Sequence, residues 1–281
     1  MQMNRLLMEK ALRDFLIEDL GTGDMSTFMI DENLNTQAVI HSKANGVVCG
    51  LEIAKMVFEI LDKDMIFSSK VTEGTYVTKG TTIATVEGKA KIILQGERLA
   101  LNLLQRLCAV ATMADTYQKK VEKYGVYVTD TRKTTPGLRI FEKYAVQIGG
   151  GRNHRFGLYD AVMLKDNHIK IAGSITKAIS DLKSQIPHTM KIEVEVENLE
   201  QVKEALENRA DIIMLDNMSI EDMKEAVKII DKKALVEASG GITLETIEEV
   251  AKTGVDYISV GALTHSYKSM DISLDMFQKK G

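Results

Sequence analysis

The chain has 281 residues, of which 44% are hydrophobic and 27% are charged, and its formal net charge is −4. These values are typical of a globular protein with one large or two ordinary domains, and they argue against a nucleic-acid-binding chain, which is usually basic. No run approaches the roughly 20 apolar residues of a membrane span, and the charged N-terminal segment lacks a signal-peptide core. We therefore expect a cytoplasmic protein.

The first 110 residues combine helical and extended patterns. Met8, Leu12 and Leu16 recur at helical spacing, which predicts an N-terminal helix that ends near Gly21. The segments that follow are expected to be extended at 37–42 and 46–51, helical at 52–61, and hairpin-like at 73–88, where Glu-Gly and Lys-Gly pairs separate short Thr/Val/Ile runs. Residues 1–110 are thus predicted to form an α+β domain.

A long helical pattern over about 91–124 leads into a regular alternation of strands and helices. Such βα repetition predicts a parallel sheet, and six or more units favour a barrel, here an irregular or incomplete one, over residues 111–266. The last residues, 267–281, lack a further βα unit, and we expect them to return to the N-terminal domain. The strands are expected at 126–130, 160–165, 192–197, 211–215, 234–239 and 256–260, and the later helices at 175–182, 199–206, 223–230 and 244–250.

Charged residues and glycines follow each predicted strand of the barrel. Since the active sites of parallel α/β barrels form at the carboxyl ends of the strands, this pattern indicates catalysis. The segment 130–168 also concentrates basic side chains in an otherwise acidic chain, which indicates binding of small anions. The strand ends in question are 130–133, 165–168, Glu195 with Glu197, 216–217, 239–241 and 260–262.

Two of these ends predict a phosphate site and two predict a metal site. Gly240 and Gly241 precede a helix expected to start near Thr243, so that backbone N–H groups can face an anion. Glu195 and Asp216 are one βα unit apart and suit Mg²⁺ completed by phosphate oxygens. Two alternatives stay open at this point: the glycines could merely make turns, and the acids could pair with a cation such as Lys165.

The remaining cations differ in their expected roles. Arg132, His154, Arg155 and Lys165 are expected to converge on a ligand with more than one negative group. Lys143 and Arg152 are expected to be solvated. On the long helix, Arg98, Asn102 and Gln105 form a polar stripe that predicts contact with a partner or a site. The two cysteines, Cys49 and Cys108, lack the spacing of a zinc site or a disulfide framework and are expected to be core thiols.

Several motifs resemble those of quinolinate phosphoribosyltransferase, the carboxylating nicotinate-nucleotide pyrophosphorylase family. They are TDTRKTTPGLR, EKYAVQIGGGRNHRFGLYDAVMLKDNHI, VEVEVENL, MLDN, VEASGGI and SVGALTHS. The resemblance runs from about Glu18 to Ser266. It implies an N-terminal α/β sandwich, an irregular α/β barrel of six to seven strands, and a homodimer or higher homo-oligomer with shared active sites.

The resemblance also implies a reaction. Phosphoribosyl pyrophosphate, bound with Mg²⁺, would transfer its phosphoribosyl group to quinolinate, giving nicotinate mononucleotide, pyrophosphate and carbon dioxide in the biosynthesis of NAD. Arg98 from a neighbouring subunit, Lys133, Glu195 and Asp216 would be catalytic, and the two acids would hold the metal. The residues implied to bind substrates are Arg98, Thr131, Arg132, Lys133, His154, Arg155, Lys165, Glu195, Asp216, Ser239, Gly240, Gly241, Val260, Gly261 and Ala262.

Three other functions remain to be distinguished. A molybdenum-transport-associated phosphoribosyltransferase-like enzyme would share the barrel and its TRKT and SGG elements. A Schiff-base lyase would use Lys165 as an amine nucleophile. A nucleic-acid-binding protein would use the basic segment 130–168, although a pI near 5.8 and the lack of an aromatic-basic surface argue against it.

Overall fold

The computed structural model describes residues 4–277 and divides into two compact units. The first unit contains residues 4–115, 135–150 and 266–277, and the second contains 116–134 and 151–265. The sequence predicts a boundary near residue 110. The segment 135–150 lies beyond that boundary in the chain and belongs to the first unit.

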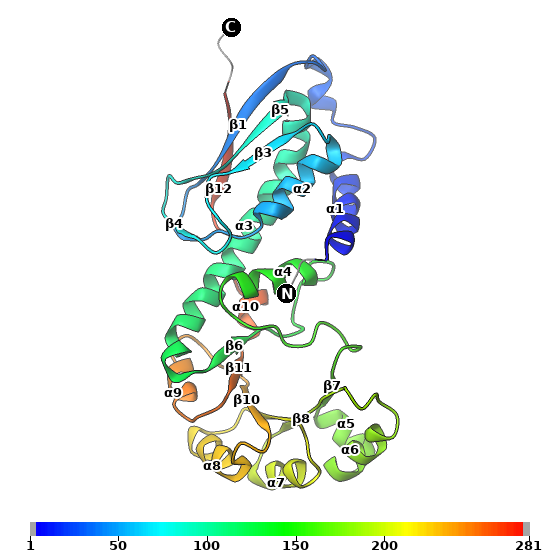
Figure 1. Cartoon of the computed structure of the whole chain (residues 1–281), viewed down its shortest axis with the longest axis vertical. Coiled ribbons are helices and arrows are strands. Elements are labelled where there is room, and N and C mark those ends of the chain that lie inside the picture. Colours follow the sequence, from blue (N-terminus) through cyan, green and yellow to red (C-terminus); the bar gives the residue numbers. More distant parts are fainter. Residues whose placement is uncertain (1–3, 278–281) are drawn as a thin grey trace. The chain divides into compact units, whose positions relative to one another are not determined.

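The first unit is built on a four-stranded antiparallel sheet with the order β12-β1-β5-β3 (Figure 1). The strands are β1 Asn35–Ser42, β3 Ile66–Ser69, β5 Thr82–Lys89 and β12 Ile272–Phe277, with the short pair β2 Gly46–Val47 and β4 Tyr76–Val77 beside them. The helices are α1 Arg5–Leu20, η1 Met25–Met29, α2 Leu51–Leu61, α3 Ala90–Val121 and α4 Arg139–Ile148.

The last strand of the chain completes this sheet. β12 pairs antiparallel with β1, from Gln37 opposite Phe277 to Ser42 opposite Ile272. The alternating burial of β1 places Ala38 and Ile40 in the core. The C-terminal segment therefore forms part of the same hydrophobic core as the first strand.

Close packing between helices stabilises the first unit. A Cβ added to Gly96 of α3 would lie 2.7 Å from the Phe58 ring of α2, so that only glycine allows this approach. α1 buries Met8, Leu12 and Leu16 and ends where Gly21 takes a positive φ of 49°. Cys49 and Cys108 are free and buried, as the sequence predicts.

The second unit contains a six-stranded parallel sheet with the order β6-β11-β10-β9-β8-β7 (Figure 1). β6 and β7 are its edges, and a bridge between Thr129 and Arg152 extends the sheet beyond β6. The predicted irregular α/β barrel is thereby confirmed as an open, six-stranded one. The strands are β6 Tyr127–Thr129, β7 Val162–Leu164, β8 Ile192–Val196, β9 Ile212–Asp216, β10 Leu235–Ser239 and β11 Tyr257–Ser259.

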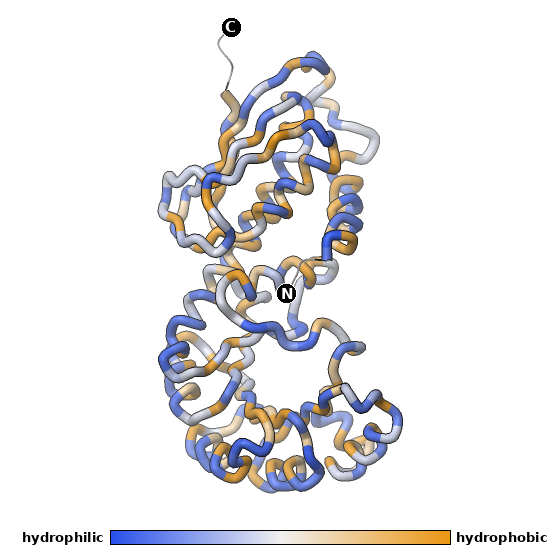
Figure 2. Tube along the Cα trace, viewed as in Figure 1, coloured by the Kyte–Doolittle hydropathy of each residue, from blue (hydrophilic) through white to orange (hydrophobic). Residues whose placement is uncertain are grey.

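Short helices follow the strands and cover their outer side. Helices α6, α7, α8 and α9 each bury apolar residues, such as Val202 and Ala205 of α7, against the sheet. Figure 2 shows hydrophobic positions gathered along the strands of this unit and hydrophilic ones along its outer helices. The helices are η2 Glu122–Tyr124, α5 Asp166–Ala172, α6 Ile175–Lys183, α7 Leu199–Glu207, α8 Ile220–Ile230, α9 Ile247–Ala251 and α10 Ala262–His265.

Two expectations about basic side chains have different outcomes. The prediction that Lys143 is solvated is wrong, because α4 buries this face of the helix and Lys143 is 0% exposed. Arg152 is exposed as expected, and its guanidinium lies 4.5 Å from the centroid of the Tyr127 ring. Among residues 4–277, no helix is both long and apolar enough to cross a bilayer.

Candidate active site

The carboxyl ends of the parallel strands surround a cavity of about 820 Å³ in the second unit. Fourteen of the fifteen residues predicted to bind substrates line it, and they come from all six strand ends. They are Thr131, Arg132, Lys133, His154, Arg155, Lys165, Glu195, Asp216, Ser239, Gly240, Gly241, Val260, Gly261 and Ala262.

Three basic side chains, Arg132, Arg155 and Lys165, face this cavity, and we call them the mouth cations. Burial lowers the pKa of Arg155, and the nearby charge of Arg132 lowers it further. Two guanidinium groups held close enough to repel each other are stabilised when an anion lies between them. Arg155 Nη1 also donates to the Ala161 carbonyl at 3.0 Å, which fixes the direction of its side chain.

Lys165 and Glu195 form an ion pair across neighbouring strands. Lys165 Nζ lies 2.6 Å from Glu195 Oε2, and the lysine side chain is 44% exposed. The pairing that the sequence left open as an alternative is therefore present. It does not exclude a role for Glu195 in binding a ligand, because the carboxylate still lines the cavity.

The loop after β10 provides a cradle of bare backbone. Gly240 and Gly241 have φ values of +95° and +60°, and a Cβ on Gly240 would lie 2.2 Å from Asn217 Oδ1. Glycine is required here because a side chain would clash and the backbone is left-handed. Successive N–H groups in such a loop form an anion-binding concavity.

The helix expected to start near Thr243 begins only at Ile247, so the prediction of its start is wrong. The hydroxyl of Thr246 accepts from the Thr243 N–H at 3.0 Å, and the hydroxyl of Thr243 accepts from the Glu245 N–H at 3.3 Å. These side-chain bonds form a turn in place of the first helical turn. The segment after β10 that was predicted to bind an anion is therefore a glycine loop rather than a helix N-terminus.

On the neighbouring strand, the loop after β11 approaches the segment after β6. A Cβ on Gly261 would lie 3.2 Å from Lys133 Cδ and 3.0 Å from His265 Nε2. The Thr264 hydroxyl donates to the Lys133 carbonyl at 2.7 Å. This contact holds the backbone of Lys133 against the strand end, with its side chain on the cavity wall.

Glu195 and Asp216 are oxygen donors suited to a magnesium ion. They come from the adjacent parallel strands β8 and β9, where Met214 lies opposite Glu195 and Asp216 is two residues further on. Both line the same cavity, and Asp216 Oδ2 accepts from Asn217 Nδ2 at 2.8 Å. Two carboxylates with room for water and phosphate oxygens fit the ligand preference of Mg²⁺.

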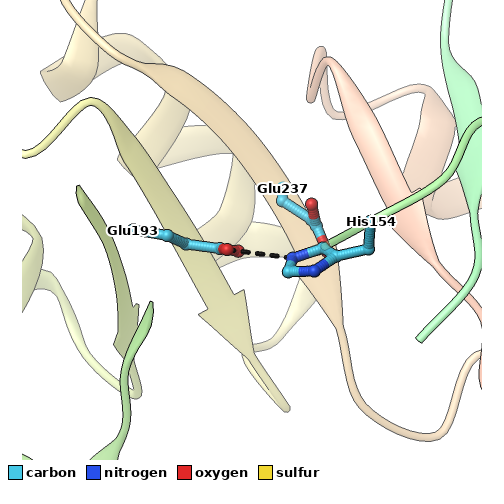
Figure 3. A group of neighbouring side chains, drawn as sticks. All are labelled: His154, Glu193 and Glu237. Atoms are coloured by element: carbon cyan, nitrogen blue, oxygen red, sulfur yellow. Dashed lines mark ion pairs between the residues drawn. The ribbon is translucent and has the colours of Figure 1, made fainter. Parts of the chain in front are cut away.

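Glu193 and Glu237, two buried acids two positions before the cavity residues Glu195 and Ser239, meet the half-buried His154. We call these three side chains the floor trio (Figure 3). His154 Nε2 lies 2.9 Å from Glu193 Oε2 and 3.8 Å from Glu237 Oε1. Burial first, and then the charge of Glu193, raises the pKa of Glu237 to about 7. These ligand atoms lie within 4.8 Å of one another and are of types that can bind a divalent cation.

Several residues of the cavity and the floor trio were not predicted to belong to the site, although each lies two positions before a predicted strand-end residue. Side chains two positions apart on a strand face the same side. Glu237 precedes Ser239 by two positions, and the same spacing relates the other missed strand residues to a predicted strand-end residue. They are Met163, Met214 and Ser259 in the cavity and Glu193 in the floor trio. Asn217, Ile242, Thr243 and His265 also line the cavity from the loops that follow the strands.

Other residues singled out in the sequence do not line this cavity. Arg98 and Asn102 are exposed on α3 in the first unit, with the Arg98 side chain 62% exposed. Gln105 was predicted to belong to the same polar stripe as Arg98 and Asn102. Unlike those two residues, it is half-buried, and its side chain donates to the Ile272 carbonyl at 2.8 Å. Glu197 is exposed at the end of β8.

Family models match nearly the whole chain. The N-terminal domain of quinolinate phosphoribosyl transferase matches residues 24–108, and the C-terminal domain matches residues 110–275. The chain is 44% identical over 274 residues to a probable carboxylating nicotinate-nucleotide pyrophosphorylase of Bacillus subtilis, covering 98% of this chain and 95% of that protein. It is 45% identical to a protein of the same description from Methanocaldococcus jannaschii, covering 95% of this chain and 96% of that one.

Solved structures agree with these matches. NadC from Streptococcus pyogenes superposes with a TM-score of 0.94 at 39% identity, covering 99% of this chain and 100% of that chain. The nicotinate-nucleotide pyrophosphorylase of Francisella tularensis gives a TM-score of 0.93 at 38% identity, covering 99% of each chain. The likeness therefore includes both units.

Proposed function

Because the chain belongs to the quinolinate phosphoribosyl transferase family, we propose that its barrel cavity binds quinolinate and phosphoribosyl pyrophosphate side by side. The protein is a carboxylating nicotinate-nucleotide pyrophosphorylase of NAD biosynthesis. It joins the phosphoribosyl group to quinolinate and releases pyrophosphate and carbon dioxide. Membership of this family decides against the two alternative enzyme classes and against the nucleic-acid-binding protein that the sequence left open.

The observation that carries the assignment of the quinolinate site is the convergence of Arg132 and Arg155. Quinolinate carries two adjacent carboxylates, and a guanidinium offers the planar fork that matches a carboxylate. The lowered pKa of Arg155 beside Arg132 supports two cations that share one anionic ligand. Lys165 adds a third charge on the same cavity wall.

We assign phosphoribosyl pyrophosphate to the other wall of the cavity. Ser239, Gly240 and Gly241, with residues 260–262 at the end of the neighbouring strand, would bind the 5-phosphate through backbone N–H groups. Thr131 and Lys133 would bind the pyrophosphate, which leaves with its negative charge balanced by the lysine. The fixed backbone of Lys133 supports this role, because Thr264 holds its carbonyl.

Glu195 and Asp216 would hold the magnesium ion and the ribose hydroxyls. Bound there, the ion would neutralise charge on the pyrophosphate. The pyridine nitrogen of quinolinate attacks C1 of the ribose while the bond from C1 to the pyrophosphate oxygen breaks. The cationic character that develops on the ribose in this step is stabilised by the carboxylate of Glu195.

Decarboxylation follows without a nucleophilic side chain. The bond between ring carbon C2 and its carboxylate breaks, carbon dioxide leaves, and the electron pair stays on C2 beside the new pyridinium nitrogen. A proton then takes its place on C2. The chain contributes alignment and charge, since the mouth cations hold the second carboxylate while the first departs.

We propose a homodimer in which Arg98 of one subunit completes the cavity of the other. Its exposed side chain on α3 in the first unit supports this assignment. Arg98→Ala and Glu195→Ala should each be inactive alone, and mixing the unfolded variants and refolding them should restore about a quarter of wild-type activity in a twofold-symmetric dimer. No recovery in the mixture would refute shared sites.

We also propose a cytoplasmic location. Free, buried thiols at Cys49 and Cys108 are compatible with a reducing compartment. Fractionation of the source cells followed by immunodetection would test it, and recovery of the protein in a membrane or secreted fraction would refute it.

The reaction itself is tested by mixing the purified protein with Mg²⁺, quinolinate and phosphoribosyl pyrophosphate. Nicotinate mononucleotide, pyrophosphate and carbon dioxide should appear in equal amounts. Omission of Mg²⁺ in the presence of a chelator should abolish product formation, and unchanged activity would refute the assignment of the metal.

A further inference from the structure

The ring of His154 is hydrogen-bonded by protein groups at both nitrogens. The Arg155 N–H donates to His154 Nδ1 at 2.9 Å, so Nδ1 acts as an acceptor. Nε2 must then carry the ring proton, and it points at Glu193 Oε2 at 2.9 Å (Figure 3). In this arrangement the imidazole is neutral and connects strand β8 to the backbone of Arg155.

The segment around Arg155 depends on such side-chain contacts for its position. Residues 153–155 belong to no helix or strand. The buried carboxylate of Asp130 accepts from the His154 N–H at 2.9 Å, and Asp160 accepts from the Phe156 N–H at 2.7 Å. The buried Asp130 and the exposed Asp160 therefore hold the backbone on both sides of Arg155, and the ring of His154 adds a third anchor at Arg155 itself.

Glu193 does not line the cavity, and it is almost completely buried, with 2% of its surface exposed. Burying a carboxylate is costly unless it accepts a strong hydrogen bond, and His154 supplies that bond. The other oxygen of Glu193 and Oε1 of Glu237 are buried without a hydrogen-bond partner. The two acids thus pay a desolvation penalty that the ring of His154 only partly offsets.

We propose that Glu193 is a positioning residue for quinolinate binding, acting through the His154 ring to hold Arg155 in the direction that its carboxylate ligand requires. The inference rests on the proposed quinolinate role of Arg155 and adds a residue beneath it that never touches the substrate. Glu237 Oε1 lies 3.8 Å from the same ring nitrogen, which is too far for a hydrogen bond. Because Nδ1 accepts a hydrogen bond, the proton is on Nε2, and a protonated ring nitrogen has no lone pair to bind a cation.

Two substitutions separate the acceptor from the shape of the side chain. Glu193→Leu removes the acceptor and leaves the Nε2 proton unpaired, and it should weaken quinolinate binding about tenfold. The Michaelis constant for phosphoribosyl pyrophosphate should stay within about twofold, because the glycine cradle is on other strands. Glu193→Gln keeps an oxygen acceptor of the same length and should restore most of the quinolinate affinity.

Quinolinate binding is measured by calorimetry on the purified protein without the second substrate, and the Michaelis constants by steady-state kinetics. If Glu193→Leu binds quinolinate as the wild type does, or loses affinity for both substrates equally, the inference is overturned. Stoichiometric zinc or manganese in the purified wild type that is lost in Glu193→Gln would also overturn it, because the trio would then be a metal site.

Arg155→Ala distinguishes this inference from the assignment on which it rests. If Arg155→Ala leaves quinolinate affinity unchanged, the proposed quinolinate site fails. If it weakens binding while Glu193→Leu does not, only the positioning role fails. In the Arg155→Ala background, adding Glu193→Leu should change quinolinate affinity by less than about twofold, since the residue that it positions is gone. If Glu193→Leu does not fold, His154→Phe takes its place in the same cycle.

Discussion

The mouth and the floor of the cavity carry opposite charges at different depths. At the mouth, Lys165 is 44% exposed and faces the ligand space together with Arg132 and Arg155. On the floor, Glu193 and Glu237 are 2% and 4% exposed. A site that binds two anions therefore stands on buried acids. We propose that the buried acids hold the protein groups around them in place, while the mouth cations bind the substrates.

The largest effect is expected at Glu195, one of the two acids at the strand ends that line the cavity. Glu195→Ala should lower kcat about 1,000-fold, because the charge that develops on the ribose loses its nearest carboxylate. It should change quinolinate affinity little. Steady-state kinetics with both substrates measure the two quantities. Glu197→Ala, an exposed acid at the end of the same strand, is the matched control and should behave as the wild type.

Removal of one mouth cation should have the next largest effect. Arg155→Ala should weaken quinolinate binding about 100-fold, because a charge-assisted hydrogen bond is lost in a half-buried place. Arg132→Ala should act in the same direction. Calorimetric titration of quinolinate measures both. Arg152→Ala, three residues away and exposed over Tyr127, should keep wild-type affinity, and an equal loss there would show that the effect is only one of net charge.

A smaller effect is expected in the glycine cradle. Gly240→Ala should raise the Michaelis constant for phosphoribosyl pyrophosphate about tenfold, since the new Cβ meets Asn217 and the left-handed backbone is strained. Gly254→Ala is the matched control, because Gly254 has a φ of +92° and its Cβ would lie 3.4 Å from Val227. That variant should lose stability without changing either Michaelis constant. Equal kinetic changes in both would remove the case for a phosphate cradle.

The smallest effect concerns the floor and appears as a dependence of stability on pH. The pKa of Glu237 is raised to about 7 by burial and by Glu193, so the folded protein favours the protonated acid. The stabilisation is complete well below the ordinary pKa of a glutamate and is lost as the pH rises through about 7. Relative to Glu237→Gln, the wild type should lose on the order of 2 kcal/mol of unfolding free energy between about pH 5 and pH 8.

Urea denaturation of both proteins at several pH values measures this difference. Stability curves that run parallel across the range would mean that Glu237 does not hold a proton in the folded protein. Because the mouth cations are the same in both proteins, the difference between the two stability curves reports on Glu237 alone.

The sequence predicts the mouth well and the floor poorly, for a physical reason. Arg132, Lys165 and Asp216 stand out as charged residues that follow apolar runs, at the strand ends where barrel active sites form. Glu193 lies inside such a run, where alternation alone marks its direction. Its partner in the trio, Glu237, comes from a strand 40 or more residues away, and no local pattern relates the two.

Some helices and strands of the fold are hard to predict from the sequence for similar reasons. β3 escaped detection because Ile66 and its neighbours are largely exposed and show no alternation. α4 escaped because its buried face includes Glu142 and Lys143, which sequence patterns assign to solvent. In contrast, the six parallel strands are buried apolar runs and were all predicted, with ends that differ by one or two residues.

A crystal structure of the protein with quinolinate bound tests the central claim most directly. The account predicts both carboxylates in the barrel cavity, within hydrogen-bonding distance of Arg132, Arg155 or Lys165, with Glu193 still bonded to the ring of His154 below them. Quinolinate bound outside this cavity, or bound inside it with its carboxylates turned away from all three cations, would contradict the account.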